Sequence, residues 1–174
     1  IRDNKLISLK PFPIKKIRPC VFEYIYFSRP DSLLNGKCAY EYRKRFGAEL
    51  AKESSLKADL VVPVPDSGNA AAIGYSQLTN IPFDLGLIRN HYVGRTFIEP
   101  AQKIRSLGVK LKLNANKSTV KDKIIILIDD SLVRGTTSHK IVKMLYDAGA
   151  KEVHVKIACP EIKYPDFYGV DTPT

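Results

Sequence analysis

The sequence predicts an α/β fold with a mainly parallel β-sheet flanked by helices. From residue 59 onward, short apolar runs alternate with helical patterns, an order that indicates parallel strands joined by right-handed crossovers. The run IIILI at 124–128 contains no polar residue, as expected for a strand that helices cover on both faces. The length of 174 residues suits one domain with a single core.

The individual elements follow from turn signals and from the spacing of apolar residues. An amphipathic helix is predicted over 37–54. Its apolar side chains recur every four residues, at Tyr42, Phe46 and Leu50. Gly149 occupies a C-cap position and ends a later helix. Strands are predicted at 59–65, 83–88, 124–128 and 153–158, and the remaining helices at 69–78 and 137–148.

The first part of the chain differs from the rest. Residues 1–20 are rich in Lys, Pro and Ile and predict a connecting arm that leads into a domain over 21–174. The run VFEYIYF at 21–27 is aromatic and β-branched, which predicts a strand that ends at the turn residues 28–31. Polar residues and a glycine over 89–100 predict a mobile loop.

The charge balance narrows the class of ligand. The chain has 28 Lys and Arg against 18 Asp and Glu, a net charge of +10. Such an excess fits nucleic acid or a small substrate with several phosphates. Many of the positive residues fall over 89–123, where the aromatic residues Tyr92 and Phe97 are too sparse to form a stacking platform. We therefore do not expect nucleic acid as a partner.

Composition also bears on location. No apolar run approaches the length of a membrane span, and the first residues lack a signal-peptide pattern. The three cysteines are odd in number and form no CxxC pair, which favours a reducing compartment over a disulfide scaffold. The expected location is the cytoplasm, without a membrane partner.

Two adjacent acids follow the apolar run at 124–128. Asp129 and Asp130 come directly after it, at the carboxyl end of a strand, where open α/β sheets bind ligands. A turn or a helix N-cap would account for one of them. The second is costly unless a cation or a hydroxyl group offsets the repulsion. Carboxylates are ligands that Mg²⁺ prefers, so the pair predicts a magnesium site.

The residues after this pair predict a phosphate site. Gly135 allows a tight turn in which successive N–H groups point inward as an anion nest. The following helix N-terminus adds partial positive charge, and hydroxyl groups add donors. The Gly-Thr-Thr motif alone could be a capped helix start, but the strand, two acids, loop and helix together are specific. The residues assigned to substrate binding here are Asp129, Asp130, Ser131, Val133, Arg134, Gly135, Thr136, Thr137 and Ser138.

The segment IIILIDDSLVRGTTS resembles the signature for 5-phosphoribosyl-1-diphosphate (PRPP) of type I phosphoribosyltransferases. The resemblance implies the type I phosphoribosyltransferase fold. It also implies that the acidic pair engages the ribose hydroxyls and Mg²⁺, while the loop wraps the 5′-phosphate. Further segments resemble amidophosphoribosyltransferase, the family that opens purine synthesis, from about residue 20 to the end. They lie at 23–32, 61–76, 87–100, 112–116 and 167–174.

This resemblance implies roles for two more groups of residues. The turn Asp66-Ser67-Gly68 matches the pyrophosphate-side loop of the family, and Ser67 matches a magnesium position together with Asp129 and Asp130. The same turn could also cap the helix at 69, and both interpretations can hold together. The flexible loop that closes over PRPP is matched by Arg89, Asn90, Tyr92 and Arg95. The catalytic roles fall on Tyr92, Arg95, Asp129 and Asp130.

The implied reaction is displacement of pyrophosphate from PRPP by ammonia, giving 5-phosphoribosylamine. Ammonia is already a nucleophile, so the protein positions the substrate, stabilises the leaving group and excludes water. The three histidines are accordingly expected to be surface or strand residues, not acids or bases; they are His91, His139 and His154. The expected partners are PRPP and ammonia, and a homo-oligomer is implied.

The chain also departs from the family. Its start at Ile1 and its end in GVDTPT indicate a piece of something longer, and nothing matches the glutaminase domain with its terminal cysteine. We expect no glutamine hydrolysis, which leaves a separate glutaminase domain as one candidate partner.

Some members carry an iron–sulfur cluster. Cys20 lies where they place one ligand, but Asp166 stands at the second place, and a single thiol cannot anchor such a cluster. The sequence therefore predicts no cluster. It also predicts that Cys20, Cys38 and Cys159 are mostly buried.

Two alternatives to a transferase remain open from the sequence. One is a non-catalytic PRPP-binding or regulatory module whose positive charge serves nucleic acid. The other is an inactive gene fragment that folds poorly without its partner domains. The intact acids and loop argue against decay at the site, whereas the missing domains argue for it at the level of the chain.

Overall fold

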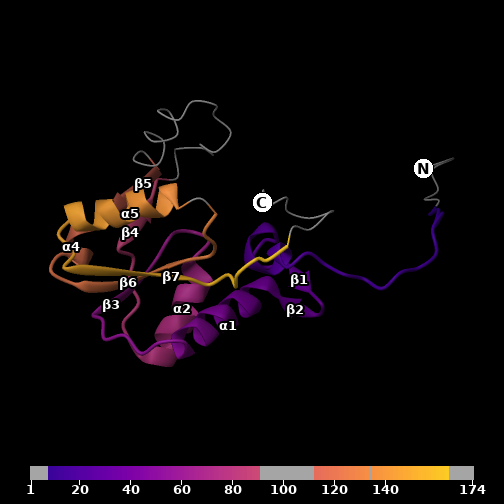
Figure 1. The fold of residues 1–174 in the computed structure, drawn as a ribbon, viewed down its shortest axis with the longest axis horizontal. Helices are drawn as coiled ribbons and strands as arrows, with labels where there is room; N and C mark the ends of the chain where they lie inside the picture. Colours follow the sequence, from indigo (N-terminus) through magenta and orange to yellow (C-terminus); the bar gives the residue numbers. More distant parts are fainter. Residues whose placement is uncertain (1–7, 91–111, 134, 165–174) are drawn as a thin grey trace.

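The central sheet is parallel, with β6 (Ile124–Asp129) between β3 (Leu60–Pro63) and β7 (Glu152–Ile157). All three strands were predicted from the sequence, and the sheet confirms the expected α/β class. Figure 1 shows the computed structural model, in which the sheet lies between helices. The structure describes residues 8–90, 112–133 and 135–164.

The helices α1 (Ala39–Lys52) and α2 (Asn69–Thr79) form a closely packed pair beside the sheet. Both agree with the predicted helices, and α2 ends at Asn80, whose φ of 58° is left-handed. Gly47 of α1 and Gly74 of α2 lie where the two backbones meet, and neither position has room for a Cβ atom. The absence of side chains at these two positions allows the close crossing.

Helices cover both faces of β6, as the unbroken apolar run predicted (Figure 1). Ile125 and Leu127 pack in one core cluster with Ile141 of α5 (Thr136–Asp147). Ile126 and Ile128 belong to a second cluster with residues of α1 and α2. Because successive side chains of a strand point to opposite faces, β6 joins two cores and is held firmly where its acidic residues begin.

The predicted strand at 83–88 is only partly correct. Phe83 makes a single parallel bridge with Val61 of β3, and a short strand, β4 (Leu87–Arg89), begins four residues later. This strand pairs antiparallel with β5 (Leu113–Ala115) in a separate two-stranded sheet. The chain leaves the main sheet at Gly86, which packs against the side chain of Val62.

The predicted strand at 21–27 is wrong. Residues Glu23–Phe27 form one turn of π-helix, η1, in which the Ser28 N–H donates to the Glu23 carbonyl at 3.3 Å. The backbone N–H groups of Glu23 and Tyr24 donate to the carbonyl groups of Cys20 and Val21, three residues earlier, and Ile25 is the buried residue of η1. A β-prone composition becomes a strand only where another strand pairs with it, and the described residues offer none here.

Two small elements were not predicted. β1 (Leu33–Leu34) and β2 (Lys37–Cys38) form a hairpin whose turn, Asn35-Gly36, has positive φ angles of 51° and 77°. A four-residue helix, α4 (Lys117–Val120), follows β5. Neither element is long enough to leave a periodic pattern in the sequence.

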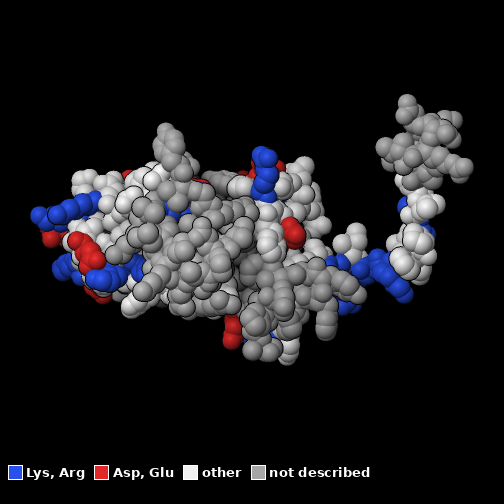
Figure 2. Space-filling model, turned by 90° about the horizontal axis from the view of Figure 1, so that it is seen from above, with Lys and Arg blue, Asp and Glu red and all other residues white. Residues whose placement is uncertain are grey.

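Residues 8–20 extend away from the body without helix or strand (Figure 1). They expose Leu9, Phe12, Ile14 and Ile17, each by more than four-fifths of its surface. On the face in Figure 2, Lys and Arg side chains lie in separate groups, some with acidic residues beside them, and several follow this arm. Of the helices described, none has the length and apolar character needed to cross a membrane.

The three cysteines differ from the expectation. Cys20, Cys38 and Cys159 are free thiols, and each is only partly buried. All three lie at the ends of elements or in connecting segments and not in the two core clusters.

Candidate functional site

The acidic pair lies at the carboxyl end of the central strand, as predicted. Asp129 is the last residue of β6, and Asp130 follows it with only 7% of its surface exposed. The backbone of both residues is fixed by the segment after β7. Ala158 N–H donates to the Asp129 carbonyl at 3.0 Å, and Cys159 N–H donates to the Asp130 carbonyl at 2.8 Å.

The electrostatics of the pair call for a cation. Burial of the Asp129 carboxyl group, and then the neighbouring Asp130 carboxylate, raise the pKa of Asp129 to about 7. A hydrogen bond from the Asp130 N–H to Asp129 Oδ1, at 2.9 Å, acts in the opposite direction but is outweighed. Ser131 Oγ donates to Asp130 Oδ1. Two carboxylates forced together in a partly buried place gain stability when positive charge joins them.

The turn Asp66-Ser67-Gly68 lies beside this pair because of a glycine. Gly68 sits against the end of β6, where a Cβ atom would be 2.4 Å from the Ile128 carbonyl oxygen. The turn is tied to the strands by two further hydrogen bonds, from Val64 N–H to Ile128 at 2.8 Å and from Gly68 N–H to Val64 at 2.9 Å. Ser67 and Asp130 consequently line the same small cavity.

The second interpretation of this turn, as the start of a helix, holds for its backbone. Gly68 is the residue that precedes α2, and this described helix start has no side-chain capping hydrogen bond. The turn instead leads into α2 through its backbone, with the Asn69 N–H donating to the Asp66 carbonyl at 3.3 Å.

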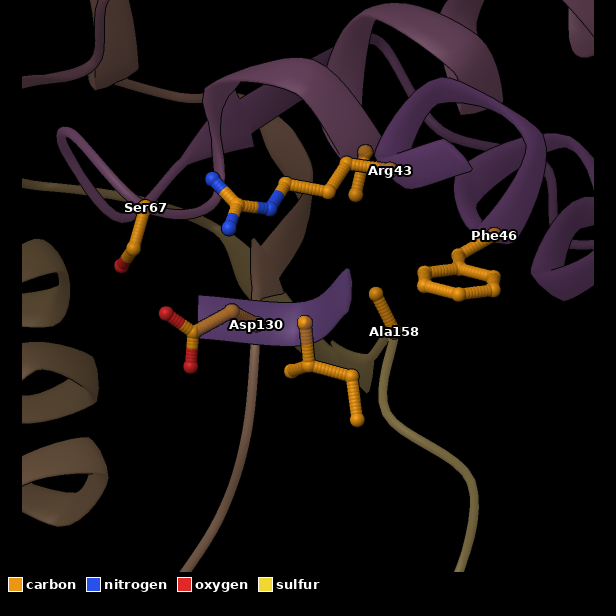
Figure 3. A pocket seen from close by; sticks show the side chains of 7 residues that line it. Arg43, Phe46, Ser67, Asp130 and Ala158 are labelled. Atoms are coloured by element: carbon orange, nitrogen blue, oxygen red, sulfur yellow. The ribbon is translucent and has the colours of Figure 1, made fainter. Parts of the chain in front are cut away.

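Arg43 is a site residue that the sequence analysis missed. It is 6% exposed, and in Figure 3 its guanidinium group points toward Ser67 and Asp130. Burial lowers the pKa of Arg43, and the charge of Asp130 opposes that effect. In the sequence Arg43 is one of several charged residues of an amphipathic helix, and no local pattern separates it from exposed neighbours such as Arg45.

The cavity that these residues share is small. Its volume is about 10 Å³, room for roughly one water molecule, and Phe46, Ala71 and Ala158 close its sides. It is therefore a structural space beneath the acidic pair and not a pocket that could hold a substrate.

The structure also brings together Asp66 and Arg89, two residues that the sequence assigns to substrate binding. Arg89, at the end of β4, forms an ion pair with Asp66, and their side chains are 31% and 52% exposed. The Nε atom of Arg89 is buried and has no hydrogen-bond partner among the described residues. Asn90 follows, and its N–H donates to the Lys112 carbonyl at 2.8 Å. A cationic group thus stands over the 66–68 turn.

The predicted phosphate loop leads into α5 as expected. Gly135 has a left-handed φ of 69°, and a Cβ atom built on it would have no neighbour within 4 Å. Glycine is therefore favoured here by the backbone conformation and not by a lack of space. Leu132 and Val133 are exposed. Thr136 is exposed and Thr137 and Ser138 are partly exposed at the start of the helix, where no side-chain cap is described. The open N–H groups of this first turn suit an anion.

Some predicted site residues are not described. Tyr92 and Arg95, with most of the predicted mobile loop, lie outside the described residues, as does Arg134. The described histidines take no part in the acidic site. His139 is exposed on α5, and His154 lies in β7 with its Nε2 atom 3.0 Å from Glu152.

The donor set is suited to Mg²⁺. Asp129 and Asp130 supply adjacent hard oxygen ligands, and Ser67 lines the same cavity as Asp130. Within the described ranges, no group of three or more His, Cys, Asp or Glu side chains could hold a metal by itself. Mg²⁺ commonly takes one or two carboxylates and completes its shell with water and phosphate oxygens, so the pair fits Mg²⁺ that arrives with a phosphorylated ligand.

No family model matches the chain. Curated relatives do: amidophosphoribosyltransferase of Rhizobium etli is 58% identical over 94% of this chain, and that of Bacillus subtilis is 56% identical over 89%. A chloroplastic amidophosphoribosyltransferase of Glycine max is 56% identical over 90%. The chain is homologous to one part of the amidophosphoribosyltransferases. It spans about a third of their length, with 33% of the first two covered and 28% of the third.

Solved structures agree with this homology. A structure described as the allosteric regulatory enzyme of purine biosynthesis has a TM-score of 0.77 and 56% identity, over 89% of this chain and 33% of its own. A glutamine PRPP amidotransferase from Bacillus subtilis, in complex with ADP and GMP, gives the same score and identity, over 89% of this chain and 34% of its own. The expected type I phosphoribosyltransferase fold of amidophosphoribosyltransferases is thereby confirmed.

Proposed function

We propose that this chain is the phosphoribosyltransferase part of an amidophosphoribosyltransferase. It binds PRPP with Mg²⁺ and lets ammonia displace pyrophosphate at C1 of the ribose, the first step of purine biosynthesis. The observation that carries the proposal is the pair Asp129 and Asp130 at the end of β6, with a raised Asp129 pKa and Ser67 beside it. Such a pair is strained without a cation and gains stability with one.

The geometry suggests how the ligand would be oriented. The first turn of α5 and Gly135 would hold the 5′-phosphate by backbone N–H groups and hydroxyls. The acidic pair at the end of β6 would accept hydrogen bonds from the ribose hydroxyls. The 66–68 turn and Arg89 would lie on the pyrophosphate side, where the buried Nε of Arg89 offers a donor.

The chemistry needs positioning more than proton transfer. Mg²⁺ held by Asp129, Asp130 and Ser67 would supply positive charge, which stabilises the negative charge that develops on the leaving pyrophosphate. Arg89 adds a second positive group on the same side. Tyr92 and Arg95 are proposed to complete the catalytic set from the loop that follows. Ammonia carries its own lone pair, so the residues around C1 need only exclude water and align it.

The remaining assignments are proposals of the same kind. Residues 1–20 are a connecting arm and 21–174 the transferase domain. The ammonia comes from a glutaminase domain, and the enzyme is a homo-oligomer. The location is the cytoplasm, although the relatives in Glycine max and Arabidopsis thaliana are named as chloroplastic.

The test is pyrophosphate release by the chain with PRPP, Mg²⁺ and ammonium. We expect release that depends on all three, and a rate at least about 100-fold lower in Asp129→Asn, because a group that organises charge in the transition state is lost. Asp147→Asn is the matched control, since Asp147 is an exposed acid on α5 that pairs with Lys143.

Three outcomes would speak against the proposal. PRPP binding without any pyrophosphate release would favour a non-catalytic module. Release that continues without ammonium would indicate hydrolysis by water. An Asp129→Asn rate equal to that of Asp147→Asn would remove the acidic pair from the mechanism.

A further inference from the structure

The two charged side chains that are buried in the described part of the chain lie around one cavity. They are Arg43, 6% exposed, and Asp130, 7% exposed. Arg43 comes from α1 and Asp130 follows β6, so the fold alone brings them together. Ser67, from the turn after β3, lines the same cavity. A buried cation thus lines the same cavity as two of the three candidate magnesium ligands.

Arg43 does not occupy the oxygens of Asp130. Its Nε donates to the Tyr24 carbonyl at 3.0 Å and its Nη2 to the Ser28 carbonyl at 2.7 Å. Arg43 and Asp130, both among the described residues, form no direct ion pair. The guanidinium group therefore balances the charge of Asp130 from a distance. Asp130 Oδ1 accepts a hydrogen bond from Ser131 Oγ, but Arg43 takes neither carboxylate oxygen, so the carboxylate can still bind a cation.

The two hydrogen bonds have a second consequence. They join α1 to the start and the end of η1, which packs on the same cavity through Ile25. A planar guanidinium group can satisfy two carbonyl groups at fixed angles while it carries its charge. A lysine at this position would keep the charge but could not reproduce the fork.

We propose that Arg43 is a positioning residue for the magnesium–PRPP site. Its buried positive charge helps to hold the Asp130 carboxylate in place, and its two hydrogen bonds hold the segment 24–28 against the same cavity, without the side chain itself touching the ligand. This inference rests on the proposed function, because it concerns the affinity of that same site. Partners that orient metal ligands from the second layer typically change affinity by about 10- to 100-fold when they are removed.

The experiment measures PRPP binding by calorimetric titration at saturating Mg²⁺. The affinity is calculated for the folded fraction of the chain. Arg43→Met is expected to weaken PRPP binding by about 10- to 100-fold, and Arg43→Lys by less, because the charge is retained. Arg45→Met removes a neighbouring exposed arginine of α1 and is expected to change the affinity less than about twofold.

A second control separates positioning from loss of stability. Leu50→Val weakens the packing of the same helix at a core residue that does not itself line the cavity, at about 1 kcal/mol. Its folded fraction should bind PRPP as the parent chain does. If Arg43→Met does not fold, the comparison of Arg43→Lys with Leu50→Val decides the question.

The inference is overturned if Arg43→Met binds PRPP as tightly as Arg45→Met does. It is also overturned if Leu50→Val loses as much affinity as the Arg43 variants, since the effect would then be general. Failure of the parent chain to bind PRPP at all would instead refute the proposed function, and this inference with it.

Discussion

Replacing Gly74 by alanine is expected to lower the free energy of unfolding by about 3 kcal/mol or more. A Cβ atom on Gly74 would lie 1.9 Å from the Lys44 carbonyl oxygen, and one on Gly47 would lie 1.8 Å from the Ala71 carbonyl oxygen. These neighbours are backbone atoms of the facing helix, so α1 and α2 must separate to make room. Alanine would add about 1 kcal/mol through helix propensity, which is too little to offset the separation.

Urea unfolding of Gly47→Ala and Gly74→Ala measures this effect. Gln77→Ala is the matched control, because Gln77 is an exposed residue of α2 and its replacement should change the stability by less than about 0.5 kcal/mol. An unchanged or raised midpoint in both glycine variants would show that the helices do not cross as closely as described.

The metal-free chain is expected to become less stable as the pH rises from about 4 to about 7. The pKa of Asp129 is about 7 in the folded chain against an ordinary value of 3.8, so the folded state binds the proton more tightly than the unfolded state does. Between these two values the folded state holds more protons, and the free energy of unfolding falls with rising pH. Above pH 7 both states are ionised and the effect is complete, at roughly 4 kcal/mol at most.

Urea unfolding in the presence of a chelator, at about pH 5 and about pH 8, measures the change. In Asp129→Asn the side chain is neutral at both pH values, so this variant should be more stable than the parent chain at pH 8 and closer to it at pH 5. Asp147→Asn should follow the parent chain, because Asp147 is exposed in its ion pair. If Asp129→Asn has the same pH dependence as the parent chain, Asp129 is not the group responsible.

The central part of the fold could be predicted because its signals are local. The unbroken apolar run before Asp129 identified a strand covered on both sides, and Ile125 and Ile126 indeed belong to different cores. The acidic pair and Gly135 then followed from their order after that strand. Each of these signals depends on neighbours within a few residues, which is the range over which sequence patterns are informative.

The errors lie where distant contacts decide the outcome. The run at 21–27 has strand propensity but pairs with no strand among the described residues, and Arg43 from α1 instead donates to the carbonyl groups of Tyr24 within it and Ser28 just after it. The stretch at 83–88 leaves the main sheet after one bridge, because β4 pairs with the distant β5. Propensity is weak compared with such tertiary contacts.

The parts of the site that the sequence missed have the same origin. Arg43 could not be separated from the solvated charges of its helix, because its burial depends on residues far along the chain. The tight fit of Gly68 against Ile128 also arises only in three dimensions. What the sequence did supply was the chemistry of the ligands, whereas the structure supplies the charge that balances them.

We propose that Asp129 and Asp130 form a magnesium-dependent PRPP site. Calorimetric titration of PRPP tests it most directly, with Mg²⁺ or with a chelator, in the parent chain and in the double variant Asp129→Asn/Asp130→Asn. We expect binding in the parent chain with Mg²⁺, and affinity at least about 100-fold lower with the chelator or in the folded double variant. PRPP binding that is equally tight without Mg²⁺, or in the double variant, would contradict it.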